Sequence, residues 1–350
     1  MQDLIHKLYA RIGRPINFME VCGTHTVALF KHGIRSLLPE GLKLLSGPGC
    51  PVCVTSIRDV DIAIALATRP NVILTTFGDM MRVPGGKQSL LEAKADGADI
   101  RIVYSPLDSL RIAKEHPDKK VVFFSAGFET TAPNAAATVS EADRLGIPNF
   151  YLHSVHKVVP PALAALLQSD DVRIDGFMLP GHVSTIIGTH VYDFLAKEFN
   201  RACVVTGFGA QDILAAIVML LRQIDEKRAD VEIQYTSVVS PEGNPKAVRF
   251  LETVFQPCDS YWRGIGVIPG SGLRLRDAFR HRDAEVMIPI EVPDHPEPKG
   301  CQCGLVLRGI KTPDQCALFG KACTPERPVG ACMVSTEGSC AAYYRFAPPV

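Results

Sequence analysis

Residues 121–131 read VVFFSAGFETT and carry the pattern that recurs through this 350-residue chain. Four consecutive apolar residues, 121–124, predict a buried strand, because β-branched and aromatic residues favour extended backbone. Gly127 and the two threonines at 130 and 131 predict a turn, and the amphipathic stretch that follows predicts a helix. A strand, a turn and a helix in this order are the unit of an α/β fold with parallel sheets.

The same unit can be followed on both sides of this stretch. Strands are predicted over residues 16–21, 42–46, 72–77, 100–104, 121–125, 150–153, 176–179, 202–206 and 232–238. Helices are predicted over residues 55–68, 107–115, 131–145, 160–167, 183–198 and 210–227. Alternation of this kind predicts parallel sheets.

Three pairs of segments resemble each other in the same order along the chain. They are residues 18–26 with 124–131, residues 47–52 with 179–184, and residues 72–78 with 203–209. The repeat predicts two similar α/β lobes, residues 1–117 and 118–243. Because ligands of open α/β sheets bind outside the carboxyl ends of the strands, the six turns are expected to line a cleft between the lobes.

The composition of the sequence changes at about residue 244. Proline and glycine become frequent, and residues 289–298 form a Pro-rich, charged stretch typical of a surface connection. The last fifty residues lack the apolar periodicity of an independent core. We therefore expect residues 244–350 to form a loop-rich third region organised by a metal cluster.

Composition excludes several classes of function. The 37 Lys and Arg residues equal the 37 Asp and Glu residues, so nucleic acid is not expected as a partner. The longest apolar run, residues 213–221, is far shorter than the roughly 20 residues that span a bilayer, so no membrane segment is expected. No signal peptide is visible at the N-terminus, which predicts a cytoplasmic location.

Nine of the 11 cysteines form two groups, a trio near the N-terminus and six after residue 300. Clustered cysteines in a reducing compartment indicate metal binding or redox chemistry rather than a disulfide framework. The six are Cys301, Cys303, Cys316, Cys323, Cys332 and Cys340. Their irregular, Gly- and Pro-containing spacing favours an iron–sulfur cluster over zinc, which more often uses paired C-x2-C knuckles. Spacing does not select four ligands from six.

Residues 47–53, GPGCPVC, place Cys50 and Cys53 at the expected start of the helix over residues 55–68. Helix N-termini favour thiolate, so these cysteines are candidates for a dithiol/disulfide couple or for two soft iron ligands.

Cys22 and His25 follow the first predicted strand, three residues apart. This pair suits either a nucleophile with its base or an iron site in which thiolate and imidazole are ligands or neighbours of ligands.

Weaker candidates end other predicted strands. Asp79, Glu129 and His182 each follow a strand, where they would face the same cleft, although helix capping or ordinary hydrogen bonding explains such residues as well. No Walker A motif is present, which argues against ATP hydrolysis.

Taken together, five motifs in order resemble the HypD family, scaffold proteins of [NiFe]-hydrogenase maturation. They are residues 19–26 (MEVCGTHT), 47–53 (GPGCPVC), 127–131 (GFETT), 180–184 (PGHVS), and the cysteine run from 303 to 340 with 318–320 (LFG) and 333–335 (MVS).

The resemblance implies two similar lobes and a region that holds a [4Fe–4S] cluster. It implies that Cys303, Cys316, Cys323 and Cys340 ligate the cluster, that Cys22 anchors iron, and that Cys50 and Cys53 form a redox pair near the cluster. It also implies that an Fe(CN)2CO group is assembled on a complex with the small chaperone HypC, with cyanide delivered by HypE after loading by HypF.

Two other functions fit part of the pattern. A freestanding iron–sulfur-dependent disulfide reductase would use Cys50 and Cys53 but would not need His25 or His182. A Cys-His hydrolase would use Cys22 and His25 and leave the cluster idle. An assembly scaffold with redox capability uses all of these residues.

Overall fold

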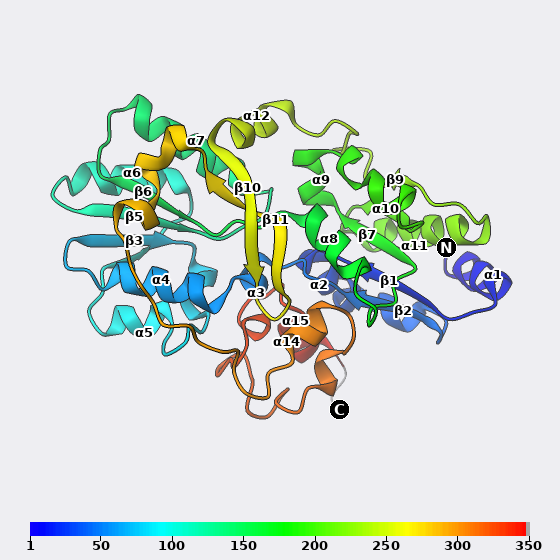
Figure 1. Cartoon of the computed structure of the whole chain (residues 1–350). Helices are drawn as coiled ribbons and strands as arrows, with labels where there is room; N and C mark the ends of the chain where they lie inside the picture. The colour runs from blue at the N-terminus through cyan, green and yellow to red at the C-terminus, as the bar shows by residue number, and fades with distance from the viewer. Residues whose placement is uncertain (348–350) are drawn as a thin grey trace.

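A computed structural model describes residues 1–347 of the chain, and it contains two parallel sheets (Figure 1). The first sheet has the order β2-β1-β7-β8-β9, and the second has the order β4-β3-β5-β6. The strands are β1 (Ile16–Glu20), β2 (Leu42–Ser46), β3 (Val72–Thr76), β4 (Ile100–Ile102), β5 (Lys120–Ser125), β6 (Phe150–Ser154), β7 (Gly176–Pro180), β8 (Ala202–Thr206) and β9 (Val231–Ile233). The predicted α/β class with parallel sheets is confirmed.

Sheet membership does not follow the predicted lobe boundary between residues 117 and 118. The chain builds β1 and β2, crosses to the second sheet for β3 to β6, and returns to pair β7 beside β1. Each sheet therefore draws strands from both predicted lobes. Two of the three similar pairs adjoin strands of different sheets, whereas residues 47–52 and 179–184 adjoin β2 and β7 of the same sheet.

Helices cover both faces of each sheet, as buried parallel strands require. On the first sheet, α1 (Gln2–Ile12), α2 (Gly23–Lys31) and α11 (Ala210–Asp225) share a core with β1, β2 and β8. On the second, α6 (Pro106–Glu115) and α7 (Ala132–Arg144) pack on β3, β5 and β6. The opposite faces meet α4 (Ile57–Ala67), α5 (Leu90–Ala95) and α8 (Val159–Leu167).

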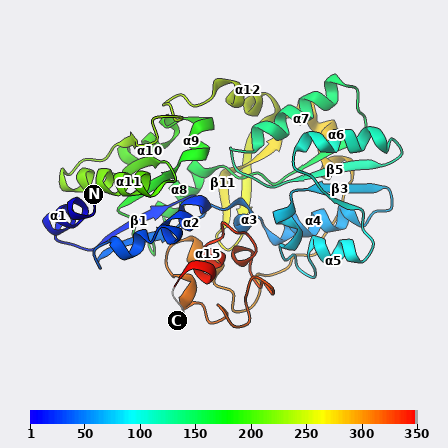
Figure 2. The same cartoon turned by 180° about the vertical axis from the view of Figure 1, so that it is seen from behind.

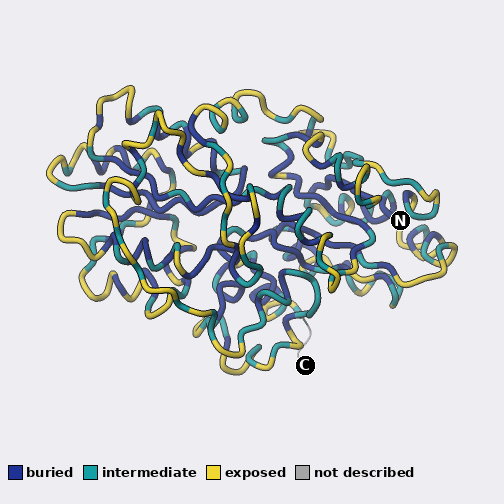
Figure 3. The backbone as a smooth tube through the Cα atoms, in the orientation of Figure 1, coloured by how far each residue is buried: buried dark blue, intermediate teal, exposed yellow. Residues whose placement is uncertain are grey.

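We call each parallel sheet with its covering helices a lobe. One buried apolar cluster runs through both lobes and the C-terminal region. It includes Met19 of β1, Phe124 of β5, Trp262 and Ala341. Figure 3 shows the buried backbone as an unbroken band from one lobe to the other. The lobes are thus packed together through a shared interior, which holds the ends of their strands in fixed positions.

Two predicted helices differ from the observed ones. Residues 183–198 form α9 (Gly181–Ile187), η3 (His190–Tyr192) and α10 (Asp193–Lys197), because Gly188 has a φ of 74° and packs against the Pro241 carbonyl. The C-x-x-C segment does not open the helix over 55–68. It forms its own turn, α3 (Pro51–Val54), before Ser56 caps α4.

The region after residue 244 is more ordered than expected. Helix α12 (Pro245–Val254) leads into an antiparallel hairpin, β10 (Phe255–Trp262) and β11 (Gly266–Leu275), whose base belongs to the core of the second sheet. Short helix α13 (Ala284–Met287) follows and lies against β6. Residues 244–287 thus form ordered elements that pack largely on the second sheet, and the six C-terminal cysteines lie in the segment after them.

The C-terminal region lies below the junction of the two lobes, and the hairpin reaches down to it (Figures 1 and 2). It contains α14 (Cys303–Leu307), η6 (Ala331–Met333) and α15 (Ser339–Phe346). Gly264 at the hairpin tip packs against Gly304 of α14, while the Arg263 N–H donates to the Val54 carbonyl of α3 at 2.9 Å. The tip therefore connects the C-x-x-C turn with the cysteine region. No helix within residues 1–347 is long and apolar enough to cross a membrane.

Candidate thiolate and cluster sites

Cys22 lies where β1 ends and α2 begins. Its extended backbone places it at the N-cap position of α2, and its carbonyl accepts the His25 and Thr26 N–H groups at 2.9 and 3.2 Å. The Cys22 N–H donates to the Glu20 carboxylate at 3.2 Å. Hydrogen bonds to the Cys22 carbonyl and from the Cys22 N–H thus fix its backbone, and with it the direction of the thiol.

The Cys22 thiol is buried, with 8% of the residue exposed. Burial raises its pKa to about 12, and the charge of Glu337 adds to this effect, while N–H groups at the start of α2 oppose it. The free thiol is therefore protonated at neutral pH. A soft metal ion would have to displace that proton, as thiolate ligation requires.

His25 and His182 both stack on one aromatic ring. Phe208 stacks on His25 with ring centroids 4.7 Å apart and on His182 at 4.0 Å. These residues follow β1, β7 and β8, so the predicted meeting of turns from several strands occurs within the first sheet. Each histidine therefore contacts the Phe208 ring.

His25 is fully buried and carries its ring proton on Nε2, which donates to the Gly207 carbonyl at 3.0 Å. Its Nδ1 is buried with no hydrogen-bond partner among the described residues. Burial lowers the pKa of His25 to about 4, so the ring is neutral at pH 7 and Nδ1 keeps a free lone pair.

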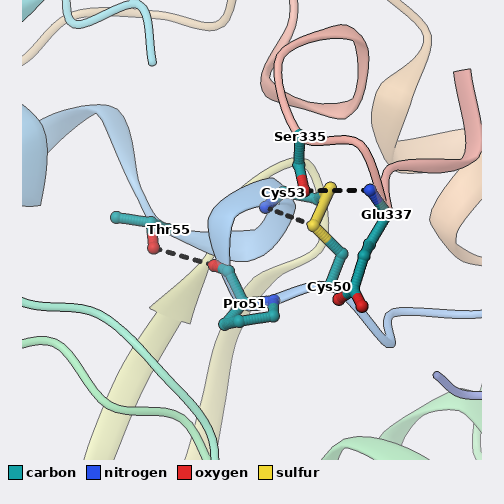
Figure 4. Close-up of a disulfide and its surroundings, with 6 residues drawn as sticks. All are labelled: Cys50, Pro51, Cys53, Thr55, Ser335 and Glu337. Atoms are coloured by element: carbon teal, nitrogen blue, oxygen red, sulfur yellow. Dashed lines mark hydrogen bonds between the residues drawn. A yellow bond between two sulfur atoms is a disulfide. The ribbon is translucent and has the colours of Figure 1, made fainter. Parts of the chain in front are cut away.

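Cys50 and Cys53 form a disulfide with a Cα–Cα distance of 5.2 Å (Figure 4). Both residues are buried, with exposed fractions of 3% and 0%. Gly49 lies against the Cys22 backbone, where an added Cβ would be 2.2 Å from the Cys22 nitrogen, and the Gly49 carbonyl accepts the Gly23 N–H. The disulfide turn and the Cys22 turn are thus in direct backbone contact.

Glu337 links these two turns to the C-terminal region. Its carboxylate accepts a hydrogen bond from Thr24 at 2.7 Å, and its backbone packs against Gly23. Figure 4 shows Glu337 and Ser335 beside the disulfide. No sequence motif singled out Glu337. Its only local signal is its place between Cys332 and Cys340, two residues after the MVS motif.

Two further predicted residues lie on the second sheet. Asp79 follows β3, and the residue as a whole is exposed to solvent. Neighbouring atoms still remove part of the water around its carboxylate, which raises the pKa of Asp79, and the negative charge of Glu337 contributes. Glu129 follows β5 and is buried, where it accepts the Val159 N–H at 2.8 Å at the start of α8. Burial raises the pKa of Glu129 to about 7. Asp79 therefore lies within range of the Glu337 charge, whereas Glu129 anchors a helix.

Two more buried polar residues were missed. Glu20 accepts hydrogen bonds from Thr26 and from the Cys22 N–H, and burial raises its pKa to about 7. A carboxylate within an otherwise buried strand, two residues before a cysteine, was a usable signal. Tyr192 is fully buried, and burial followed by the charge of Glu129 raises its pKa. No sequence pattern distinguished it.

The C-terminal cysteines line one cavity. Cys303, Cys316, Cys323 and Cys340 all face it, and Cys301 lines it as well. Cys332 is fully buried and is not among the lining residues. The structure thus brings the four expected ligands together but places Cys301 with them.

The cavity has the chemistry that an iron–sulfur cluster needs. The Val329 N–H donates to Cys323 Sγ at 3.3 Å, and a Cβ at Gly330 would be 2.7 Å from the sulfurs of Cys301 and Cys303. Within residues 1–347, no three His, Cys, Asp or Glu side chains converge on a point that could hold one metal ion. A four-iron cluster needs thiolates distributed around a cavity, one to each iron, so these residues fit it.

Comparison with known proteins identifies the family of the chain. The HypD family model, described as "Hydrogenase formation hypA family", matches residues 1–347. The chain is 47% identical over 348 residues to hydrogenase maturation factor HypD of Rhodobacter capsulatus, covering 98% of this chain and 92% of that protein. It is 48% identical over 339 residues to the HypD of Escherichia coli, covering 95% and 90%. The chain therefore belongs to the HypD family of hydrogenase maturation factors.

Proposed function

We propose that this protein is the scaffold on which the Fe(CN)2CO group of a [NiFe]-hydrogenase is assembled, in complex with a HypC-type chaperone. The observation that carries the proposal is the convergence of Cys22, the Cys50–Cys53 disulfide and Glu337 of the cysteine region. Iron that carries cyanide and carbonyl is the cargo, and a thiolate is the soft ligand that it prefers.

In this proposal Cys22 holds the iron. His25 Nδ1 is a free acceptor on the same turn, and His182 stacks on Phe208. A ring N–H of His182 can donate a hydrogen bond to bound cyanide, which only accepts, whereas His25 Nδ1 can accept a proton or a hydrogen bond beside the iron. Cyanide would arrive from a HypE-type donor loaded by a HypF-type protein.

Cys303, Cys316, Cys323 and Cys340 would hold the [4Fe–4S] cluster. When bound, the cluster supplies single electrons, because it changes oxidation state one electron at a time. The C-x-x-C turn α3 contacts η6, which carries Cys332 and the cavity-lining Met333. Cys50 and Cys53 would take up two electrons and two protons to become two thiols, storing the reducing equivalents beside Cys22. Thiols kept available for a cluster suit a reducing compartment, so we place the reaction in the cytoplasm.

The rival function, a freestanding disulfide reductase, requires that a partner's disulfide reach Cys50 or Cys53. Exchange proceeds by attack of a thiolate on an accessible sulfur, and both residues are at least 97% buried. Burial therefore favours an internal redox pair over an external one.

Infrared spectroscopy tests the proposal directly. The chain should be co-expressed with its small chaperone and the cyanide-delivering proteins, then purified without oxygen. Bands in the cyanide and carbonyl stretching region are expected in the complex and not in chain purified from cells that lack the cyanide donor. A complex that supports hydrogenase maturation without these bands would overturn the proposal.

A further inference from the structure

An aromatic groove adjoins the cysteine-lined cavity and shares a wall with it. The groove is lined by Phe30, Phe319, Tyr343 and Tyr344. Cys316 and Phe319 line both the groove and the cavity. Cys316 is also the least buried of the four expected ligands, since the other three are 8% exposed. The wall between groove and cavity is therefore one layer of side chains.

The side chains of the groove hold one another in place. Phe30 meets Tyr343 edge to face at 4.6 Å, and Phe319 meets Tyr344 at 6.2 Å. The Arg35 guanidinium lies over Phe30 at 4.9 Å. Tyr344 is nevertheless 42% exposed, so a pre-organised apolar surface is open to solvent directly outside the wall.

A second hollow has a lining with more basic than acidic side chains. It is lined by Arg82, Lys87 and Arg327, together with Val329, whose N–H donates to Cys323 Sγ. We call the cations on and between the two hollows the cationic rim: Arg82, Lys87, Lys321, Arg327 and Arg345.

Two members of the rim, Arg82 and Arg345, lie near the Glu326 carboxylate. Hydrogen bonds from its own backbone and from Thr324 lower the pKa of Glu326, and the charges of Arg82 and Arg345 lower it further. No rim residue forms an ion pair with any residue in the described part of the chain.

Charge on this face differs from that of the whole chain. Four rim cations line the two hollows, Arg82, Lys87, Lys321 and Arg327, against three carboxylates, Glu92, Asp314 and Glu326. The fifth cation, Arg345, lines neither hollow but acts on Glu326. The chain as a whole has a formal net charge of zero. The positive excess is therefore local and lies beside the cysteine cavity.

We propose that a small acidic one-electron carrier docks on the aromatic groove and the cationic rim and passes electrons through the wall formed by Cys316 and Phe319. The inference rests on the proposed function, because it needs the cluster as electron acceptor. Each encounter oxidises one carrier by one electron. Two encounters and two protons reduce the Cys50–Cys53 disulfide to two thiols.

The geometry suits a short-lived encounter. Electron-transfer complexes have small interfaces, so a groove and its rim provide enough area. Opposite charges steer such encounters and raise the association rate, and added salt screens this effect. The expected partner is therefore recognised by its negative charge and by an exposed redox centre.

The test is the rate at which a reduced plant-type [2Fe–2S] ferredoxin, an acidic carrier, reduces the cluster of the anaerobic protein. In the Lys321→Glu/Arg327→Glu variant, we expect the second-order rate at low salt to fall at least about tenfold and to lose most of its salt dependence. The matched control is Lys246→Glu/Arg249→Glu on α12, at the opposite end of the molecule from the cysteine region (Figure 1), which should stay within about twofold of the parent.

Further measurements distinguish a wrong docking surface from an absent cluster and from a dimer interface. Methyl viologen radical, a small cation, should reduce the cluster at least as fast in the variant as in the parent. If ferredoxin reduces parent and variant equally, the docking surface is wrong and the cluster proposal stands. If neither reductant changes the visible spectrum, no redox cluster is present and both proposals fall. If sedimentation shows a dimer that the variant dissociates, the face joins two copies of the chain and the carrier proposal is overturned.

Discussion

The Thr24 hydroxyl donates a 2.7 Å hydrogen bond to the Glu337 carboxylate and joins two residues that lie 313 positions apart in the chain. Through this bond the turn that carries Cys22 is closed by the C-terminal cysteine region. Because the partner is a carboxylate, the bond is worth about 1.5–3 kcal/mol.

Thr24→Val removes the hydroxyl and keeps the shape of the side chain. We expect the turn to open more often, so that alkylation of Cys22 accelerates by about fivefold or more. Mass-spectrometric peptide mapping after timed alkylation measures this. Thr68→Val, which removes a bond from an exposed helix end, is the control. An unchanged Cys22 rate in Thr24→Val would show that Glu337 does not close the turn.

Cys22→Ala should retain the fold and the brown colour of the cluster but lose the cyanide and carbonyl infrared bands. Cys22→Ser should fail nearly as badly, because a hydroxyl is a poor ligand for soft iron. Hydrogenase maturation in a strain that lacks the native gene gives a second readout. Bands that persist in Cys22→Ala would place the iron elsewhere, with Cys50 and Cys53 as the next candidates.

Replacing Cys316 or Cys323 by Ala should bleach the anaerobic protein and lower its iron content, because each is expected to hold one iron of the cluster. Cys301→Ala should keep both, although Cys301 lines the same cavity. Visible absorbance and iron analysis, about four irons for an intact cluster, check this. Bleaching by Cys301→Ala alone would exchange the assignments, and stoichiometric zinc in a colourless protein would exclude the cluster.

Gly49→Ala should damage the site where the two thiol turns meet. An added Cβ would lie 2.2 Å from the Cys22 nitrogen and 2.5 Å from its Cα, so backbone must move. Overpacking of this kind costs about 1–3 kcal/mol, and we expect a lower melting temperature together with loss of the infrared bands. Gly78→Ala is the control, since its nearest neighbour would be at 3.6 Å. Equal behaviour of the two variants would contradict the close packing.

His156 predicts a dependence of stability on pH. Its nitrogens are 3.2 and 3.1 Å from the Ser125 and Ser154 hydroxyls, and burial lowers its pKa from 6.5 to about 3. Between these values the unfolded chain binds a proton that the folded protein does not. Stability from this group is therefore full above pH 6.5 and declines as the pH falls, by up to about 1.4 kcal/mol per pH unit.

His156→Gln should consequently show a smaller drop in melting temperature between pH 7 and pH 5 than the parent. The comparison is the difference between the two pH values, so a uniform loss of stability in the variant does not affect it. An identical drop in both proteins would show that His156 is not the responsible group.

The sequence by itself determined the features that depend on local pattern. Runs of apolar residues predicted β1 to β8 to within about two residues, because a strand buried on both faces needs a continuous apolar run. Glycine-rich segments after them correctly placed Cys22, Cys50 and His182 at carboxyl ends of strands. The grouping of six cysteines predicted a metal cluster, because a loop-rich segment with little apolar content needs another organiser, and five of the six line one cavity.

Only the tertiary structure decided which strands share a sheet and which turns touch. Pairing of β1 with β7 joins residues about 160 positions apart, and no local pattern records which of several similar strands will be the neighbour. The same holds for the stacking of both histidines on Phe208 and for Glu337 at the Cys22 turn. These contacts join segments far apart in the chain, and they depend on the shapes of surfaces that form only when the whole chain has folded.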